Sequence, residues 1–286
     1  AHLETPKMLR CFTTEARLMV HLAQHPHPGL PRGYGEHIHG RERYILMELV
    51  HGASLAELMA VAQREGRPIP EALVRRVGLE IASALAYVHE VPAPDGSPMQ
   101  LVHRDVAPPN ILVGFDGRAR LIDFSTAQAA CPELTPEPLG SRSGRLGYMS
   151  PESLVSPPTA HADQYALGAT LYELATGQRL VPTSTPEETL AWVTRGVHTP
   201  VLTHRPELSP SLAYAIERTL APSPAERFAS MGAFEAVLAR DAEPDDAALV
   251  LAFLGELMGA VAAREREALR RIRRGPREAP VKRGSA

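Results

Sequence analysis

The sequence predicts an α+β fold in which a little β structure precedes a mostly helical body. Two short strand-like runs, 33–37 and 44–50, are joined by the polar turn His39-Gly40-Arg41 and indicate a hairpin. Helical patterns follow, and the longest is an amphipathic stretch over 71–90 whose apolar stripe must be buried. A hydrophobic content of 44% in 286 residues supports one large domain or two lobes that share a cleft.

The other elements follow from spacing and capping signals. Apolar spacing predicts a first helix over 10–24, and the capping box Ser54-Leu55-Ala56-Glu57 opens a short helix to residue 62. Short strands are expected at 111–113 and 119–122, on either side of the turn Asp116-Gly117. Residues 129–148 have no apolar period and are expected to form a mobile loop. Further helices are predicted over 162–176, 186–195, 211–220 and 231–240.

The C-terminal part differs in composition. An acidic linker, 243–246, precedes a predicted helix over 247–263 with one apolar face. From residue 264 the chain carries nine Lys/Arg against three Glu, which predicts a solvated, partly disordered basic tail. Binding of the tail to an anionic surface or a partner is the alternative.

Composition excludes some classes of function. A net charge of −3 argues against bulk electrostatic binding of nucleic acid. Cys11 and Cys131 form no disulfide or zinc pattern, so a reducing cytoplasm is the expected location. No signal peptide or membrane-spanning run is visible. The start at Ala1 predicts a processed product or a fragment.

The segment His103-Arg104-Asp105-Val106-Ala107-Pro108-Pro109-Asn110 and the later Asp123-Phe124-Ser125 carry the chemistry. Asn110 lies five residues and Asp123 eighteen residues after Asp105. Metal-assisted phosphoryl transfer needs one carboxylate to orient a hydroxyl nucleophile. It also needs an amide oxygen and a second carboxylate to hold Mg²⁺ against phosphate oxygens.

Two further motifs, Tyr148-Met149-Ser150-Pro151-Glu152 and Ala225-Glu226-Arg227-Phe228, occur in the same order as in a known family. Over about residues 10–240 the chain resembles the eukaryotic-type (Hanks-type) protein kinases, in particular the bacterial Ser/Thr kinases. The resemblance implies Mg-ATP-dependent phosphorylation of Ser/Thr hydroxyls in a protein substrate that the sequence does not identify. It also implies a two-lobe fold with an incomplete small β lobe (1–50), a helical large lobe (51–240), and a C-terminal helix with a basic tail (241–286).

The resemblance implies a role for each catalytic-loop residue. Asp105 would orient the substrate hydroxyl, and Asn110 and Asp123 would hold Mg²⁺. His103 and Arg104 would support the loop, and Arg104 could pair with a phosphorylated residue.

The resemblance also implies a nucleotide site. Glu15 stands where the family places the glutamate that pairs with the nucleotide-binding lysine; a solvated surface Glu is the alternative. The backbone of Glu48 and Val50 would bond adenine, and Met47 and Leu112 would contact the nucleotide unless they are plain core residues.

Other residues would be scaffold or regulatory. Glu152 and Arg227 would form a buried ion pair, and Asp163 would brace the catalytic loop. Thr135, Ser141 and Ser143 are candidate phosphorylation sites, with an unmodified hydroxyl as the alternative for each.

The pattern departs from the family in several places. No glycine-rich loop and no strand lysine precede Glu15, and Lys7 lies outside a strand context, so we expect weak ATP binding and poor phosphorylation by this chain. Ala107 replaces a lysine that contacts the transferred phosphate, and Ser125 replaces a glycine. Arg145 stands near the place of a substrate-facing threonine. Two alternatives stay open: a pseudokinase that acts as a scaffold, and a small-molecule phosphotransferase.

Overall fold

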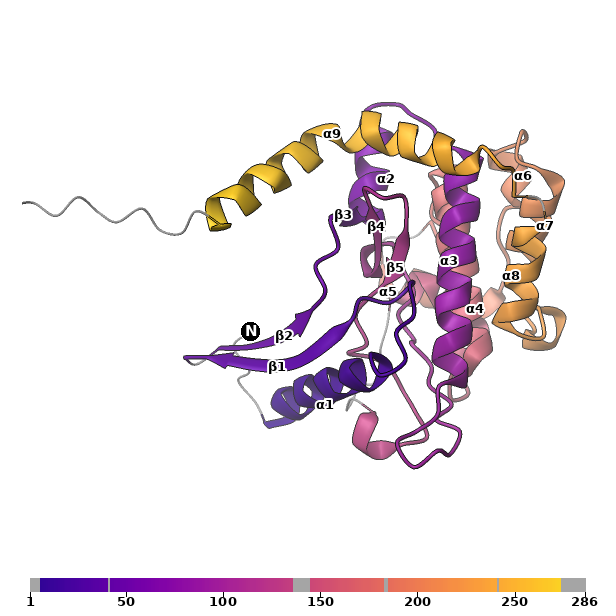
Figure 1. Ribbon diagram of the computed structural model, residues 1–286. Coiled ribbons are helices and arrows are strands. Elements are labelled where there is room, and N and C mark those ends of the chain that lie inside the picture. The colour runs from indigo at the N-terminus through magenta and orange to yellow at the C-terminus, as the bar shows by residue number, and fades with distance from the viewer. Residues whose placement is uncertain (1–5, 41, 136–144, 183–184, 241, 274–286) are drawn as a thin grey trace, which may run out of the picture.

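The computed structural model describes residues 6–40, 42–135, 145–182, 185–240 and 242–273 (Figure 1). The predicted α+β class is confirmed: a small sheet and helix stand beside a larger, mainly helical lobe. In the small lobe, helix α1 (Pro6–Leu22) packs against a hairpin of β1 (Gly33–His39) and β2 (Glu42–Met47). The hairpin is antiparallel, and its register runs from Gly33 opposite Met47 to His39 opposite Glu42.

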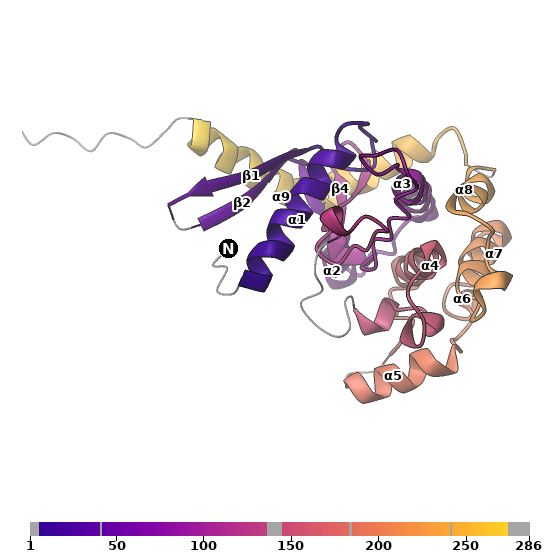
Figure 2. The ribbon, with the colours of Figure 1, turned by 90° about the horizontal axis from the view of Figure 1, so that it is seen from below.

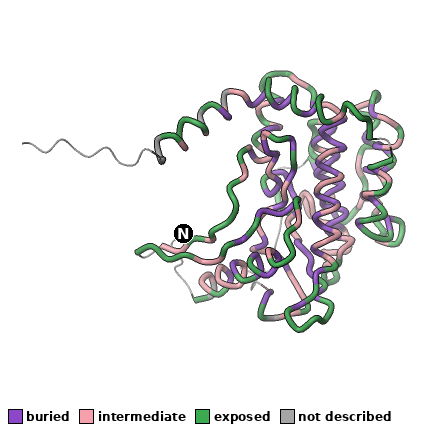
Figure 3. The backbone as a smooth tube through the Cα atoms, in the orientation of Figure 1, coloured by how far each residue is buried: buried purple, intermediate pink, exposed green. Residues whose placement is uncertain are grey.

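Helix α1 packs tightly on the hairpin because Gly33 has no side chain. A Cβ atom at Gly33 would lie 2.7 Å from the Cβ of Met19, closer than van der Waals contact permits. The buried face of α1 includes Leu18, Met19 and Leu22. Tyr34, Ile38 and Leu46 of the hairpin remain exposed. Figure 3 shows that much of the hairpin is exposed or half-buried.

The large lobe is built around helix α3 (Glu71–Glu90), whose predicted bounds are confirmed. Its apolar stripe is fully buried because α4 (Ala160–Thr176) and α8 (Met231–Ala239) pack against it. Helix α4 is buried on nearly all sides and supplies the centre of the lobe. Three further helices, α5 (Pro186–Arg195), α6 (Val201–His204) and α7 (Pro210–Thr219), complete the lobe (Figure 2).

A second sheet packs against α3 of the large lobe, and the catalytic loop leads into its strand β4. Its strands β3 (Gly52–Ser54), β4 (Ile111–Gly114) and β5 (Ala119–Leu121) are antiparallel in that order. Ser54 caps helix α2 (Leu55–Arg64), and the predicted capping box with Glu57 is present. The catalytic loop ends in a short 3₁₀ turn, η1 (Pro108–Asn110), that leads directly into β4.

Helix α9 (Asp246–Arg273) crosses the large lobe next to α3 and α2 (Figure 1). Val250, Phe253 and Leu257 are buried against the lobe, and Arg67 bonds Glu256 at 2.6 Å. His51, which follows the link between the lobes, bonds Glu265 at 2.9 Å. Among the described residues no single helix is long and apolar enough to cross a bilayer. Two segments of α9, Asp246–Gly259 and Val261–Arg270, meet at a bend of 71° and pass that test together by length and composition only.

Several predicted bounds were wrong. Helix α1 begins at Pro6 rather than residue 10, since proline fits the first turn of a helix. Strand β2 ends at Met47, where the register with β1 begins at Gly33, rather than at residue 50. Strand β3 was not predicted. Helix α9 continues ten residues beyond the predicted end at residue 263.

Candidate active site

The catalytic loop is held by a buried carboxylate from α4. Asp163, which is fully buried, accepts hydrogen bonds from the backbone N–H groups of His103 and Arg104, both at 2.8 Å. Arg104 has a φ of 72°, a left-handed conformation that costs energy for a non-glycine residue. The two bonds to Asp163 therefore stabilise a turn that the chain would not adopt alone.

His89, from the last turn of α3, also bonds Asp163 at 2.9 Å. Burial acts to raise the pKa of Asp163, but the bonds and charges of His89 and His103 outweigh it and hold that pKa below its usual value. Sequence reasoning missed His89. The available signal was its place four residues after Leu85, in line with the buried stripe of α3.

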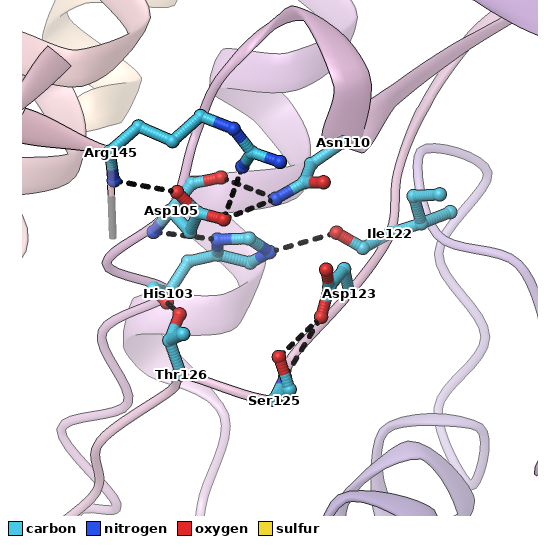
Figure 4. Close-up of polar contacts among 8 residues, drawn as sticks. All are labelled: His103, Asp105, Asn110, Ile122, Asp123, Ser125, Thr126 and Arg145. Carbon is cyan, nitrogen blue, oxygen red and sulfur yellow. Dashed lines mark hydrogen bonds and ion pairs between the residues drawn. The ribbon is translucent and has the colours of Figure 1, made fainter. Parts of the chain in front are cut away.

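Asp105 and Asn110 face each other across the loop (Figure 4). The amide nitrogen of Asn110 donates to the carboxylate of Asp105 at 2.8 Å and to its carbonyl at 2.9 Å. Arg145 reaches the same carboxylate from the other side, through its guanidinium at 2.5 Å and its backbone N–H at 3.2 Å. The carboxylate of Asp105 is therefore fixed by two residues on opposite sides.

Asp123 is brought to the same place by bonds between its segment and the catalytic loop. The Nε2 of His103 donates to the carbonyl of Ile122 at 3.1 Å, and Thr126 donates to the carbonyl of His103 at 3.1 Å. Burial lowers the pKa of His103, and the charges of Asp163 and Asp123 act against this shift. Asp123 itself has a φ of 70°, and its carboxylate accepts the Ser125 hydroxyl at 2.6 Å.

Glu15 of α1 lies near Asp123, whose charge acts on it, and its predicted pairing with a nucleotide-binding lysine stays a prediction. Burial first, and then the charge of Asp123, raises its pKa to about 7, against a backbone hydrogen bond from Phe124 that lowers it. Among the side chains that the structure describes, no lysine or arginine forms an ion pair with Glu15 or Asp123. Two neighbouring carboxylates without a cation suit a site that binds one.

The raised pKa of Glu15 predicts a pH-dependent stability. Between about 4.5 and about 7 the folded state binds a proton that the unfolded state has lost, so the free energy of unfolding falls as pH rises. The full shift corresponds to at most about 3–4 kcal/mol. The Glu15→Gln variant removes this titration, so urea unfolding should show a smaller loss between about pH 5 and about pH 8 than in the wild type. Equal losses in both proteins would contradict the assignment.

Asn110 and Asp123 each have an oxygen atom that is available to a Mg²⁺ ion. Because its nitrogen donates to Asp105, Asn110 directs its amide oxygen away from that carboxylate. One oxygen of Asp123 is oriented by Ser125, and no described bond occupies the other. Within the described residues no cluster of three His, Cys, Asp or Glu could hold a metal alone. One amide and one carboxylate oxygen fit Mg²⁺, which keeps water and phosphate oxygens as its other ligands.

The predicted adenine-binding residues lie along the link between the lobes. Met47 ends β2 and is 39% exposed, and the N–H of Glu48 donates to the carbonyl of Arg32 at 2.8 Å. Val50 is half-buried in the link. Leu112 lies on β4, opposite Ser54, just beyond the link. No described bond joins these residues to the catalytic loop, so their nucleotide roles stay predictions.

Glu152 and Arg227 form a closely bonded ion pair in the large lobe. Both terminal nitrogens of Arg227 bond the carboxylate, at 2.7 and 2.8 Å. Arg227 also donates to the carbonyls of His161 and Ala221. Burial acts to raise the pKa of Glu152, but the bond and charge of Arg227 hold it below its usual value.

Of the three predicted phosphorylation sites, the structure describes only Thr135. The hydroxyl of Thr135 bonds the carbonyls of Ala129 and Cys131, so phosphorylation would break two loop contacts. Ser141 and Ser143 lie outside the described residues. The guanidinium of Arg104, the expected phosphate partner, bonds Gln128 at 3.1 Å.

Comparisons with known proteins show which family the chain resembles. Residues 3–238 match the family model of the protein kinase domain. The chain is 30% identical over 234 residues to tyrosine-protein kinase MasK of Myxococcus xanthus, covering 80% of this chain and 35% of that protein. It is 35% identical over 222 residues to serine/threonine-protein kinase PknE of Mycobacterium tuberculosis, covering 76% and 36%. It is 31% identical over 235 residues to PknA of the same species, covering 80% and 50%. The chain thus spans about a third to a half of these relatives.

Proposed function

The chain belongs to the protein kinase family, and we propose that it is the catalytic part of a serine/threonine protein kinase that uses Mg-ATP. The observation that carries this proposal is the convergence of Asp105, Asn110 and Asp123 (Figure 4). A carboxylate for a hydroxyl and two oxygen ligands for a metal are among the protein groups that phosphoryl transfer uses.

Each residue has a distinct task in this proposal. Bound Mg-ATP supplies the phosphoryl group and the charge of the metal. Asp105 accepts the hydrogen bond of the substrate hydroxyl and orients its oxygen. Asn110 and Asp123 hold the metal, and Ser125 keeps the Asp123 carboxylate in place. Asp163 positions the loop because its carboxylate accepts hydrogen bonds from two backbone N–H groups of the loop.

The acceptor side chain is proposed from the relatives. PknE and PknA are serine/threonine kinases by name, whereas MasK is a tyrosine kinase by name. Retention of Asp105, Asn110 and Asp123 argues against a pseudokinase scaffold, which needs none of the three. A cytoplasmic location, and an anionic surface or partner for the basic tail, stay predictions.

The function is tested by the metal dependence of phosphate transfer in the whole protein that contains this chain. Incubation with labelled ATP and Mg²⁺ is expected to label Ser or Thr in the protein or in a general acceptor protein, and EDTA should stop the reaction. The Asp123→Asn variant should need at least about tenfold more Mg²⁺ for half-maximal rate, because a neutral amide replaces the charged ligand.

Phosphoamino-acid analysis identifies the acceptor. Label on tyrosine alone would replace the serine/threonine proposal, and no label at all in the wild type would favour the scaffold. The control is Asp116→Asn, which removes an exposed carboxylate of the β4–β5 turn that pairs with Arg120. This control should leave the Mg²⁺ dependence unchanged.

A further inference from the structure

We infer that Arg145 is a catalytic residue, which supplies the positive charge beside the transferred phosphoryl group while one of its N–H groups holds Asp105. The inference rests on the proposed function and adds to it a residue from outside the catalytic loop. Arg145 precedes the 3₁₀ turn η3 (Leu146–Tyr148), 40 residues after Asp105 in the chain. Its place in the site is visible in Figure 4.

Arg145 is held close to the reacting groups. Its guanidinium bonds the Asp105 carboxylate at 2.5 Å, on the oxygen that also accepts the amide of Asn110. Its own backbone N–H bonds the second carboxylate oxygen at 3.2 Å. A residue fixed to this carboxylate by both its backbone and its side chain lies where the substrate hydroxyl must approach.

The catalytic loop carries no cation of its own at this point. The four residues between Asp105 and Asn110 are Val, Ala, Pro and Pro, and Ala107 is fully buried. The sequence has only two lysines, Lys7 and Lys282, and neither belongs to the loop. Arg104 directs its guanidinium to Gln128. In the part of the chain that the structure describes, Arg145 is the one Lys or Arg whose side chain bonds Asp105.

The guanidinium has donors left for an anion. Arginine carries five N–H donors, and the described bond to Asp105 comes from one terminal nitrogen. The side chain is 42% exposed, and it lines both a cavity of about 80 Å³ beside Asp105 and a groove of about 570 Å³ between α2 and α5. Arginine matches phosphate oxygens through paired N–H groups, so these free donors suit a phosphoryl group that arrives next to Asp105.

The reaction gives this charge a defined use. The substrate hydroxyl oxygen forms a bond to the terminal phosphorus and its proton passes to Asp105. The bond from that phosphorus to the bridging oxygen breaks, and its electron pair leaves with ADP. Negative charge spreads over the transferred oxygens in the transition state, and a fixed cation beside them stabilises it more than it stabilises the ground state.

The test compares Arg145→Ala and Arg145→Lys with the wild type, in the whole protein. Arg145→Ala should lower kcat by about 10²–10³-fold, and Arg145→Lys, which keeps the charge but loses the paired donors, should lose less. Without turnover, calorimetry should show that Arg145→Ala binds Mg-ADP with aluminium fluoride, a mimic of the transferred phosphoryl group, at least about tenfold more weakly. Its affinity for Mg-ADP alone should stay within about twofold.

The matched control is Arg76→Ala. Arg76 has a similarly exposed side chain, at 37%, and one ion pair, with Glu80 on α3. This variant should keep the wild-type kcat. Thermal unfolding of all variants detects misfolding, and the lysine variant keeps the test valid if the alanine variant unfolds.

Three outcomes would overturn the inference. An unchanged or higher kcat in Arg145→Ala would mean that Arg145 is passive or acts as a latch on Asp105. A wild type that binds Mg-ADP with aluminium fluoride no more tightly than Mg-ADP would show that no such charge stabilisation exists. A wild type without any phosphate transfer would remove the proposed function as well, and so is distinguishable from the first two.

Discussion

Replacing Asp105 by asparagine is expected to lower kcat by about 10²–10⁴-fold, the usual contribution of a general base. Asparagine has the shape of aspartate and can still accept the bond that Asn110 donates at 2.8 Å. It cannot take the proton of the substrate hydroxyl, and it carries no charge to hold Arg145. The loss should therefore fall on kcat. The affinity for Mg-ADP, measured by calorimetry, should change little.

The result is interpretable only against a matched substitution. Asp116→Asn changes the same functional group at an exposed turn and should keep the wild-type kcat. Thermal unfolding should show that Asp105→Asn folds like the control. A kcat within about tenfold of the wild type would contradict the role of Asp105, because it falls below the range expected for a base.

Replacing Arg227 by methionine is expected to lower the free energy of unfolding by about 3–5 kcal/mol. The side chain of Arg227 is fully buried, and that of Glu152 is 19% exposed. Methionine would leave the Glu152 carboxylate and the carbonyls of His161 and Ala221 without their donor. Urea unfolding at neutral pH measures the loss. The double variant Glu152→Leu with Arg227→Met should regain part of it, because no charge is then left unpaired.

The same pair predicts a pH dependence. The pKa of Glu152 lies below its usual 4.5 in the folded state, so its contribution to stability is present above about 4.5. That contribution is lost as pH falls through the lower folded pKa. As pH falls into the acid range, the free energy of unfolding should therefore decrease in the wild type. The decrease should be smaller or absent in Arg227→Met. Identical acid profiles in the two proteins would contradict the coupling.

The sequence was most informative where one strong periodicity decided the structure. Helix α3 has its predicted bounds because five apolar residues, all fully buried, repeat along one face. Strand β3 was missed since three residues carry no period, and only its pairing with β4 makes it a strand. The length of α9 was underestimated because charge in residues 264–273 suggested a solvated tail.

In the site, too, some features could be predicted from the sequence and others depend on tertiary packing. Motif spacing predicted which residues meet around Asp105, but it did not predict His89 beneath Asp163 or the bond from Arg145. Both contacts join segments separated by 40 or more residues, where side-chain direction depends on packing. Ser125 was read as a departure from a glycine. Its hydroxyl in fact bonds Asp123, a role that only the fold reveals.

The bonds from Asp163 to the catalytic loop have a consequence for motion. They tie the loop backbone to α4, the most buried helix of the large lobe, so the loop opens only when that core opens. Glu15 stands on α1, whose Leu18 and Leu22 share the hydrophobic core with α3, and whose end is held to the large lobe by the bonds of His21 to Pro92 and of Tyr87 to Leu22. The geometry of Asp105 thus depends on the core around α4, whereas the distance between Glu15 and Asp123 depends on how α1 packs against that core.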